Sequence, residues 1–211
     1  MMTEVMGRKV LSYDRDGDDH YQVISAFIKS MRATDPDAAA YWLQRLLEAG
    51  EDPIFLLRRM VVFASEDIGH ADPQALQVAT SALTAFRLVG LPEGNYHLMQ
   101  AATYLATAPK SNTVLRTIQA AKQAVQECGH LPVPMHLRNA STQLQKSLGH
   151  GQGYHYPHDS GGDPKGQRGM PTGLENRVIF EPGNAGMEAQ FKARIRAVRG
   201  ENGAPDLSGQ S

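Results

Sequence analysis

Apolar residues recur every three or four positions between residues 18 and 128, the spacing of a helix that buries one face. This pattern predicts six helices, which begin near Asp18, Asp35-Pro36, Pro53, Asp72-Pro73, Pro92-Glu93 and Ser111 or Asn112. Four of them begin with a proline near the first helical position, where the missing N–H costs no hydrogen bond. No stretch shows the strict alternation of a strand. The sequence therefore predicts an all-α fold, a helical bundle with an irregular C-terminal tail.

The same periodicity predicts which side chains face the core. We expect these inward residues to be Leu76, Ala79, Leu83 and Phe86 in the fourth helix, Leu98, Ala101, Ala102 and Leu105 in the fifth, and Val114, Ile118, Ala121 and Val125 in the sixth. Gly90 is the expected end of the fourth helix, because glycine accepts the left-handed conformation that follows many helices.

A cluster of charges lies among the apolar residues of the third helix. It consists of Arg58, Arg59, Glu66 and Asp67, and the helix has two apolar faces rather than one. An unpaired buried charge costs several kcal/mol, so these residues need partners. The pattern predicts that this helix is either the centre of the bundle or a subunit interface. A structural ion-pair network inside one subunit and a ligand site are the alternatives.

The chain changes character after Gly129. The prolines of the segment 131–134 favour an extended backbone, and Asn139 is a candidate cap for a short helix that ends near Gly149. Residues 150–173 are rich in Gly, Pro, His and Asp and predict a loop. A last amphipathic helix is expected around Met187, Phe191 and Ile195, and its basic face contains Lys192, Arg194, Arg196 and Arg199.

The composition limits the classes of function. The 211 residues have a net charge of −1, so the chain has no global field that attracts nucleic acid, and we expect weak DNA binding at physiological salt. The basic face of the last helix is the one local exception. A single cysteine, Cys128, leaves no internal disulfide and fits a reducing cytosol. No secretory signal or membrane-spanning run is present in the sequence, so we expect a cytoplasmic protein with no membrane partner.

Isolated motifs give no self-contained active site. The run Asp14–Asp18 has its glycine in the wrong register for a calcium loop, and the glycines at 162 and 166 lack the spacing of a phosphate loop. His150, His155, His158 and Asp159 have no zinc-site spacing, and loop packing is the simpler interpretation. Cys128 and His130 are neighbours in sequence but lack an identified third group. We therefore expect no catalytic residue, no metal and no cofactor in this chain.

An ordered series of motifs runs through the chain. It comprises Asp16-Gly-Asp-Asp-His-Tyr21, Asp35-Pro-Asp-Ala-Ala39, Ala49-Gly-Glu-Asp-Pro53, Ala64-Ser-Glu-Asp-Ile-Gly69, Ala108-Pro-Lys-Ser-Asn112, His136-Leu-Arg-Asn-Ala140 and Tyr156-Pro-His-Asp159. The series resembles the C-terminal half of the RarA/MgsA family of AAA+ ATPases, relatives of the eukaryotic Werner-helicase-interacting ATPase. The resemblance covers roughly residues 13–188. Met170-Pro171 departs from it, because the aromatic residue that the family places before Leu-Pro is missing.

The resemblance implies a function in replication-fork maintenance and recombination, in a DNA-stimulated ATPase related to clamp loaders. It implies ATP and Mg²⁺ in the whole protein, with nucleotide-binding motifs in an N-terminal half that has no counterpart in this sequence. Its implied partners are DNA, single-strand-binding protein and further copies of itself, as a homotetramer assembled by a helical collar. Its motifs also suggest a surface made of Lys110, Ser111, Asn112, His136, Arg138, Asn139, Tyr156, His158 and Asp159.

The pattern and the resemblance together predict four regions. These are a flexible lead-in at 1–17, a helical oligomerisation domain at 18–149, a loop-rich tail packed on the bundle at 150–186, and a short basic helix with a disordered end at 187–211. Two other classes of function stay open. One is an adaptor that binds a partner protein through the tail, and the other is a small metal-dependent hydrolase that uses the histidines near residue 155.

Overall fold

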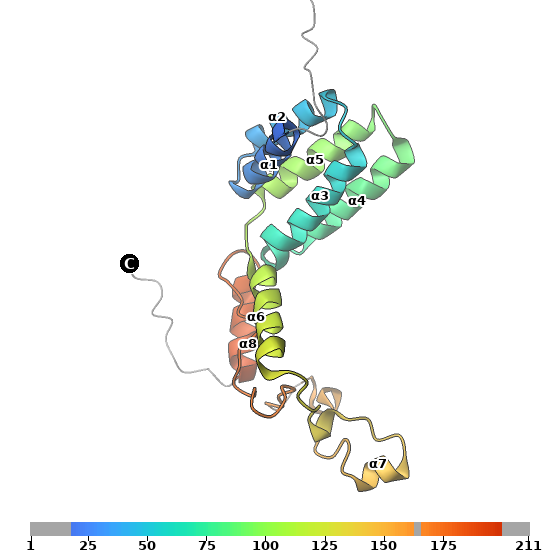
Figure 1. The fold of residues 1–211 in the computed structure, drawn as a ribbon, viewed down its shortest axis with the longest axis vertical. Helices are drawn as coiled ribbons and strands as arrows, with labels where there is room; N and C mark the ends of the chain where they lie inside the picture. The colour runs from blue at the N-terminus through green and yellow to red at the C-terminus, as the bar shows by residue number, and fades with distance from the viewer. Residues whose placement is uncertain (1–17, 163–165, 200–211) are drawn as a thin grey trace, which may run out of the picture. The chain divides into compact units, whose positions relative to one another are not determined.

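Eight α-helices and no strands are found in residues 18–162 and 166–199, which the computed structural model describes (Figure 1). The all-α prediction is therefore confirmed for this part of the chain. The helices are α1 (Asp18–Arg32), α2 (Pro36–Glu48), α3 (Pro53–Phe63), α4 (Gln74–Val89), α5 (Gly94–Thr107), α6 (Thr113–Cys128), α7 (Gln143–Ser147) and α8 (Glu188–Arg199). The predicted lead-in, most of the calcium-like run 14–18 and the end beyond residue 202 lie outside the described residues.

The helix starts agree with the turn chemistry of the sequence. The side chain of Asp35 accepts a hydrogen bond from Ala38 N at 2.9 Å, and Pro36 follows as the first residue of α2. Asp52 caps α3 in the same way through Ile54 N, at 2.9 Å, with Pro53 as the first residue. Each cap satisfies one N–H that has no partner inside its own helix. Gly90, at φ +67°, ends α4 as expected.

The chain divides into two units at the junction of Asn112 and Thr113. The helices α1–α5 belong to the first unit, and α6–α8 with their connecting loops belong to the second. The predicted boundary between a helical domain and a tail, at residues 149 and 150, falls inside the second unit and stays a prediction.

The first unit is built around α5. This helix packs against all four others, α1, α2, α3 and α4 (Figure 1). Its alanines Ala101, Ala102 and Ala106 are fully buried, and such small side chains allow neighbouring helices to approach closely. Leu98 and Leu105 complete the buried face of α5, as predicted. The centre of the bundle is therefore α5, while α3 packs mainly against α4 and α5.

One of the four residues predicted for the core face of α4 is exposed, while Leu83 packs against the core as expected. Leu76 of α4, expected inside, is 41% exposed, whereas the buried residues of this helix are Ala75, Ala79, Ala82 and Phe86. The periodicity favoured the larger leucine, but α4 turns its alanines toward α5 because a small-residue stripe permits the closer packing. Ala79 and Phe86 were predicted correctly.

The third helix extends beyond Phe63, in agreement with the prediction that places Glu66 and Asp67 on it. It continues as a π-helical turn over Ala64–Ile68 and a 3₁₀ turn over Gly69–Ala71 before α4 begins. A π turn widens the helix by one residue and is rare. It holds Ala64 and Ile68 in the core and directs Asp67 toward the C-terminal end of α1.

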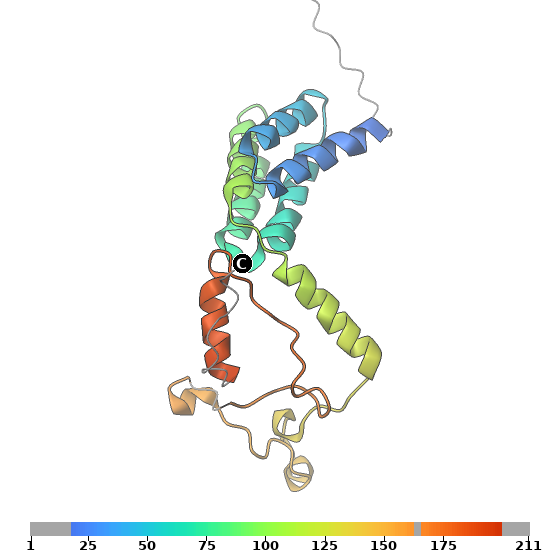
Figure 2. The same ribbon diagram turned by 90° about the vertical axis from the view of Figure 1, so that its left-hand side faces the viewer.

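The second unit has little core of its own. The helices α6 and α8 overlap in Figure 1 but lie apart in Figure 2. Among its described apolar residues only Ala124 and Pro182 are buried, and the predicted inward residues Ile118 and Val125 are 47% and 61% exposed. The prediction of their burial is therefore wrong for a single chain, because residues 170–179 face this side of α6 only across a cavity and leave it largely exposed.

The short helix α7 has a different cap from the one predicted. Thr142, not Asn139, accepts a hydrogen bond from Gln145 N, and the side chain of Gln145 accepts one in return from Thr142 N. This reciprocal capping box begins the helix three residues later than expected. The expected loop of residues 150–173 contains one 3₁₀ turn, Pro157–Ser160. None of the helices in the described residues is both long and apolar enough to span a membrane.

Candidate functional site

The π-helical turn contains Asp67, a charged residue that forms hydrogen bonds with other segments of the first unit. Its two carboxylate oxygens accept hydrogen bonds from Arg32 at the end of α1, at 2.5 Å from Nε and 3.1 Å from Nη2. The Asp67 side chain is 13% exposed and that of Arg32 is 48% exposed. This hydrogen bond raises the pKa of the Arg32 guanidinium. A bidentate ion pair of this kind fixes both the orientation and the separation of its two side chains. It therefore holds α1 against the turn after α3.

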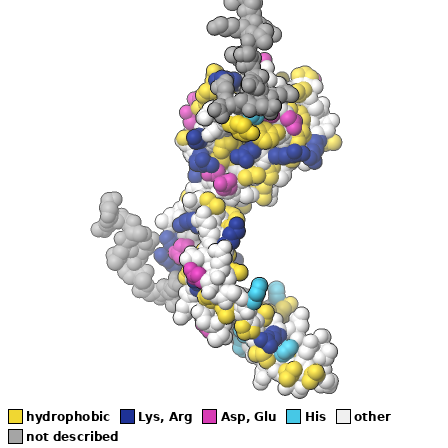
Figure 3. All heavy atoms as spheres, in the orientation of Figure 1, with side chains coloured by type: hydrophobic (Ala, Val, Ile, Leu, Met, Phe, Trp, Pro, Cys, Tyr) yellow, Lys and Arg dark blue, Asp and Glu magenta, His cyan; other side chains and the backbone are white. Residues whose placement is uncertain are grey.

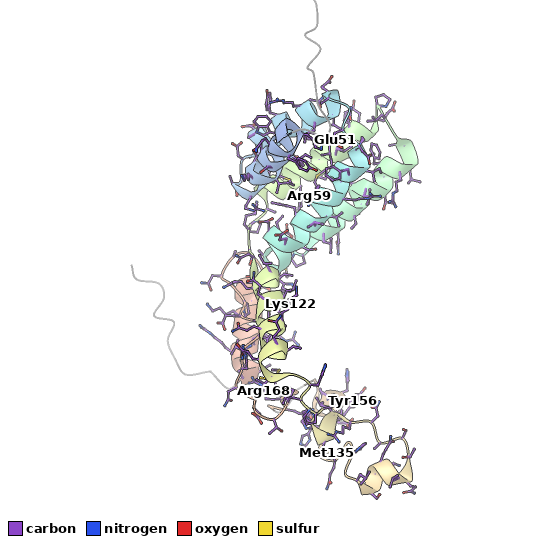
Figure 4. All side chains as sticks on the ribbon, in the orientation of Figure 1. Glu51, Arg59, Lys122, Met135, Tyr156 and Arg168 are labelled. Atoms are coloured by element: carbon purple, nitrogen blue, oxygen red, sulfur yellow. The ribbon has the colours of Figure 1, made fainter. Side chains whose placement is uncertain are left out.

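The four predicted charges of the third helix do not form one network. Arg58 and Arg59 are exposed on α3, and neither pairs with an acid among the described residues (Figure 4). Glu66 is also exposed and contributes only its electrostatic field to Arg32. Figure 3 shows Lys and Arg side chains in a broad band across this face. Whether these residues lie in an interface stays a prediction.

Arg59 borders a groove between α1 and α3. The groove has a volume of about 520 Å³. Its floor is apolar, formed by Ile24, Ile28 and Phe55, and Lys29 and Arg32 line it together with Arg59.

The segment that leaves α5 is tied to the same turn. Lys110 donates hydrogen bonds from Nζ to the carbonyl oxygens of Ala106 and Ala108, at 2.8 and 2.5 Å. Burial lowers the pKa of Lys110, against the field of Asp67, which raises it. Ser111 N donates to the backbone oxygen of Asp67 at 2.8 Å. We call Arg32, Asp67, Lys110 and Ser111 the clasp. Asn112, the third predicted residue of this motif, is exposed.

A second polar tie joins α5 to the start of α4. Tyr104 donates its hydroxyl to Asp72 Oδ2 at 2.7 Å, while Asp72 Oδ1 accepts from Gln74 N at 3.0 Å. The hydrogen bond to Asp72 is the main cause that raises the pKa of the Tyr104 phenol, followed by burial. One carboxylate thus caps a helix and anchors a neighbouring one.

The second unit is held together by a buried carboxylate, Glu188, at the start of α8. It is fully buried and accepts hydrogen bonds from the Thr113 hydroxyl at the start of α6 and from Gly183 N, the latter at 2.7 Å. A Cβ on Gly183 would lie 2.6 Å from Glu188 Oε2, so any other residue there would have to displace the buried carboxylate. The hydrogen bonds compensate the cost of burying the charge. Glu188 therefore joins the first and last helices of the second unit.

The remaining predicted surface residues lie in the loops of the second unit, where each makes a local contact. His136 Nε2 lies 3.1 Å from Arg168 O, and Arg138 Nε donates to Val133 O at 2.8 Å. The Asn139 carbonyl lies 3.2 Å from His150 Nδ1. The Tyr156 and His158 rings are in contact with centroids 5.0 Å apart, and Asp159 N donates to Tyr156 O at 3.0 Å. These contacts hold loop to loop and leave Tyr156 53% exposed.

Cys128 and His130 border an apolar cavity of about 340 Å³ in the second unit. Its other walls come from α6 and from residues 170–179, including Met170 and Pro171. The structure therefore places the departure from the family motif at the edge of this cavity. In the part of the chain that the structure describes, no three His, Cys, Asp or Glu side chains are grouped to hold a metal ion.

Sequence reasoning missed Arg32, Tyr104 and Glu188 as structural residues. Their partners lie 35, 32 and 75 positions away along the chain, so no local pattern connects them. Only the charge of Asp67, in an apolar surrounding, was visible in the sequence.

The described part of the chain is thus an all-α module in which hydrogen bonds between side chains connect helices that are distant in the sequence. The family model described as MgsA AAA+ ATPase C terminal matches residues 33–199, and the one described as AAA C-terminal domain matches residues 1–32. The chain belongs to the MgsA family of AAA+ ATPases. The border between the two matched regions falls at the end of α1, beside Arg32 of the clasp.

Relatives with curated names support the same family. The chain is 43% identical to the replication-associated recombination protein A of Haemophilus influenzae over 200 residues, which cover 94% of this chain and 45% of the relative. It is 41% identical to the protein of that name in Escherichia coli K12 over 196 residues, covering 92% and 44%. The ATPase WRNIP1 of Dictyostelium discoideum is 41% identical over 181 residues, covering 85% and 21%. The chain thus spans less than half the length of these relatives.

Proposed function

We propose that this chain is the self-association region of a DNA-dependent AAA+ ATPase that acts in replication-fork maintenance and recombination. Assembly into a homotetramer is the form that the family resemblance favours. Single-strand-binding protein and DNA are the partners of the whole protein in this proposal, and ATP with Mg²⁺ are its cofactors. The chain itself is proposed to have no ATPase activity, since its sequence contains no GxxxxGK[ST] phosphate loop.

The observation that supports self-association is the apolar surface of the second unit. Thirteen of its large hydrophobic side chains are exposed, against one buried alanine and one buried proline, among the residues that the structure describes. Soluble domains usually bury such residues in a core, and contiguous exposed apolar area marks an interaction site. On α6, Ile118 and Val125 lie two helical turns apart on one face and are 47% and 61% exposed. This α6 face is the surface that we assign to the contact between copies.

The α3 face is a weaker candidate than the α6 face. Arg58 and Arg59 are exposed and hydrated in the single chain, so nothing is gained by covering them unless a partner brings carboxylates. Covering Ile118 and Val125 gains about 25 cal/mol for each Å² of apolar surface removed from water. A closed symmetric assembly repeats this gain at every copy.

Light scattering after size exclusion tests the proposal with two matched variants. Ile118→Glu combined with Val125→Glu places charges on the α6 face, and we expect a folded chain of monomer mass. Leu76→Glu is the control, because Leu76 is 41% exposed in the first unit, and we expect it to keep the wild-type mass. Arg59→Ala with Val62→Glu tests the α3 face in the same experiment.

Three results decide the outcome. A wild-type mass about four times that of the chain, lost only in the α6 variant, supports the proposal. A wild type that stays monomeric at ~100 µM, far above the micromolar range of weak association, contradicts it. Loss of mass in the α3 variant alone moves the interface to α3.

ATP turnover by the purified chain, above that of a heat-inactivated sample, would contradict the proposed lack of activity.

A further inference from the structure

The near-zero net charge of the chain conceals two units of opposite charge. The sequence has seven Lys and Arg against eleven Asp and Glu between Asp18 and Asn112, but eleven against six between Thr113 and Arg199. The formal charges are thus −4 for the first stretch and +5 for the second, and the second unit as a whole is +3 because Glu201 and Asp206 also belong to it. The second unit should therefore attract a polyanion more strongly than the total charge of −1 suggests.

The excess positive charge has a regular arrangement on α8. Lys192, Arg196 and Arg199 follow one another at four- and three-residue spacing and so lie along one stripe of the helix, about 10 Å long. Arg194 flanks the apolar side of α8. We call these four residues the α8 cations; Figure 3 shows Lys and Arg side chains over this helix and α6.

No carboxylate in residues 18–162 or 166–199 forms an ion pair with the α8 cations. Lys192 Nζ donates to the amide oxygen of Asn184 at 2.8 Å and Arg199 Nη2 to the carbonyl oxygen of Phe180 at 2.9 Å, and both acceptors are uncharged. Among the described residues, Arg194 and Arg196 have no ion-pair or hydrogen-bond partner. Glu188, the carboxylate at the start of α8, is fully buried and bound by Thr113 and Gly183. The stripe thus keeps its charge, with two of its members held in place by neutral acceptors.

We propose that the α8 cations bind the phosphodiester backbone of nucleic acid without reading its sequence. A stripe about 10 Å long spans about three phosphate intervals of one strand, which are about 3.4 Å each along a duplex axis, so each of its three cations can neutralise one phosphate. Arg194 is exposed, and the three stripe cations are half-buried. Long cationic side chains of this kind neutralise phosphates but do not read base edges. Lys122 on α6, exposed and without a partner in the described part of the chain, adds to the same field (Figure 4).

An anionic membrane is the other polyanion that a basic helix can meet, and the structure favours it less. Phe191 and Ile195, the apolar residues of α8, are half-buried within their own unit, so only Val198 is an exposed large hydrophobic residue of the helix. A helix that lies on a membrane needs a free apolar face. The basic band of the first unit is also a weaker candidate for nucleic-acid binding. In the stretch 18–112 as a whole, Asp and Glu residues outnumber Lys and Arg residues.

Fluorescence anisotropy with a labelled 30-base-pair duplex and a labelled 30-nucleotide thymidine strand tests the proposal on the full chain. Three neutralised phosphates predict a slope of log K against log salt of about −2.7, a roughly twenty-fold loss between about 50 and 150 mM salt. Arg194→Glu with Arg196→Glu should weaken binding at least ten-fold at ~50 mM, while Arg194→Lys with Arg196→Lys should retain it. Arg58→Glu with Arg59→Glu makes the same change of charge in the first unit and should have little effect.

The outcomes separate this proposal from others. Equal losses in both Glu variants would show a general charge effect and overturn the assignment, as would no binding by the wild type at ~50 mM. Binding of phosphatidylglycerol vesicles in place of both oligonucleotides, lost in the α8 variant, would assign the helix to membranes instead. Circular dichroism and light scattering on the same samples check the fold and the mass. The proposal does not depend on self-association, because loss of binding at unchanged mass supports it and a change of mass is read separately.

Discussion

Neighbouring residues of the same charge have different roles in this chain, according to what surrounds them. Asp67 is largely buried and pairs with Arg32 through both oxygens, whereas the adjacent Glu66 is exposed and has no direct hydrogen bond in the described residues. The π-helical turn causes this difference, because it turns one acid toward α1 and the other toward solvent. The backbone oxygen of Asp67 also accepts a hydrogen bond from Ser111 N. The position of Asp67 therefore affects both α1 and the segment that follows α5.

Removal of the Asp67 side chain should therefore destabilise the first unit. Asp67→Ala leaves Arg32 without its carboxylate, and we expect a loss of about 1–3 kcal/mol in the free energy of unfolding. Glu66→Ala is the matched control on the adjacent exposed site, with an expected change below about 0.5 kcal/mol. Urea unfolding at a fixed protein concentration measures both, since association itself changes apparent stability.

The same measurement in an Arg32→Ala background shows whether the pair is the cause. There the Asp67→Ala change should cost much less, because the partner is already absent. Equal losses for Asp67→Ala and Glu66→Ala would mean that the contact with Arg32 contributes nothing to stability.

At the scale of the elements, one carboxylate forms hydrogen bonds with two helices. Asp72 caps α4 through Gln74 N and receives the Tyr104 hydroxyl from α5. The pKa of Tyr104 is raised in the folded chain, chiefly by that hydrogen bond. The folded state therefore holds the phenolic proton more tightly than the unfolded state does.

This difference gives the contact a defined pH dependence. Its stabilisation is fully present below the unfolded pKa of about 10 and is lost as pH rises through that value toward the raised folded pKa. Tyr104→Phe should cost about 1 kcal/mol at pH 8, and the deficit relative to the wild type should shrink above pH ~10. Urea midpoints at the two pH values measure this change. Tyr96→Phe on the same helix, where the ring is 78% exposed, is the control with no expected effect. A deficit that is unchanged above pH ~10 would contradict the assignment.

The helices of the first unit were largely predictable, because their starts depend on local chemistry. Asp35-Pro36 and Asp52-Pro53 show a cap and a first-turn proline in the sequence, and both act as expected. The buried face of α4 was less predictable, since Ala75 and Leu76 differ by one register position and only packing against α5 selects the alanine. The tie between Thr113 and Glu188 spans 75 positions and has no local signature at all.

At the scale of the whole molecule, the two units differ in how they are stabilised. The first has a continuous core of large side chains, including Phe27, Leu57 and Phe63, whereas the second depends on Glu188 and a few partly buried residues. Regions with few buried apolar contacts open at lower free energy than regions with a full core. The second unit of a single chain should therefore open far more readily than the first, unless another copy covers it.

Hydrogen exchange at two protein concentrations tests this expectation directly. Backbone amides in the middle of α5, buried in the first unit, should exchange slowly at both ~1 µM and ~100 µM, and they serve as the internal reference. Amides of α6 around Ile118 and Val125 should exchange quickly at the lower concentration, where the chain is dissociated. They should gain at least ten-fold protection at the higher one, because association removes the open state by mass action. The double α6 variant, Ile118→Glu with Val125→Glu, should lose this gain while α5 stays protected. Exchange in α6 that is slow and independent of concentration would show that the second unit is stable alone, and its exposed apolar residues would then no longer support self-association.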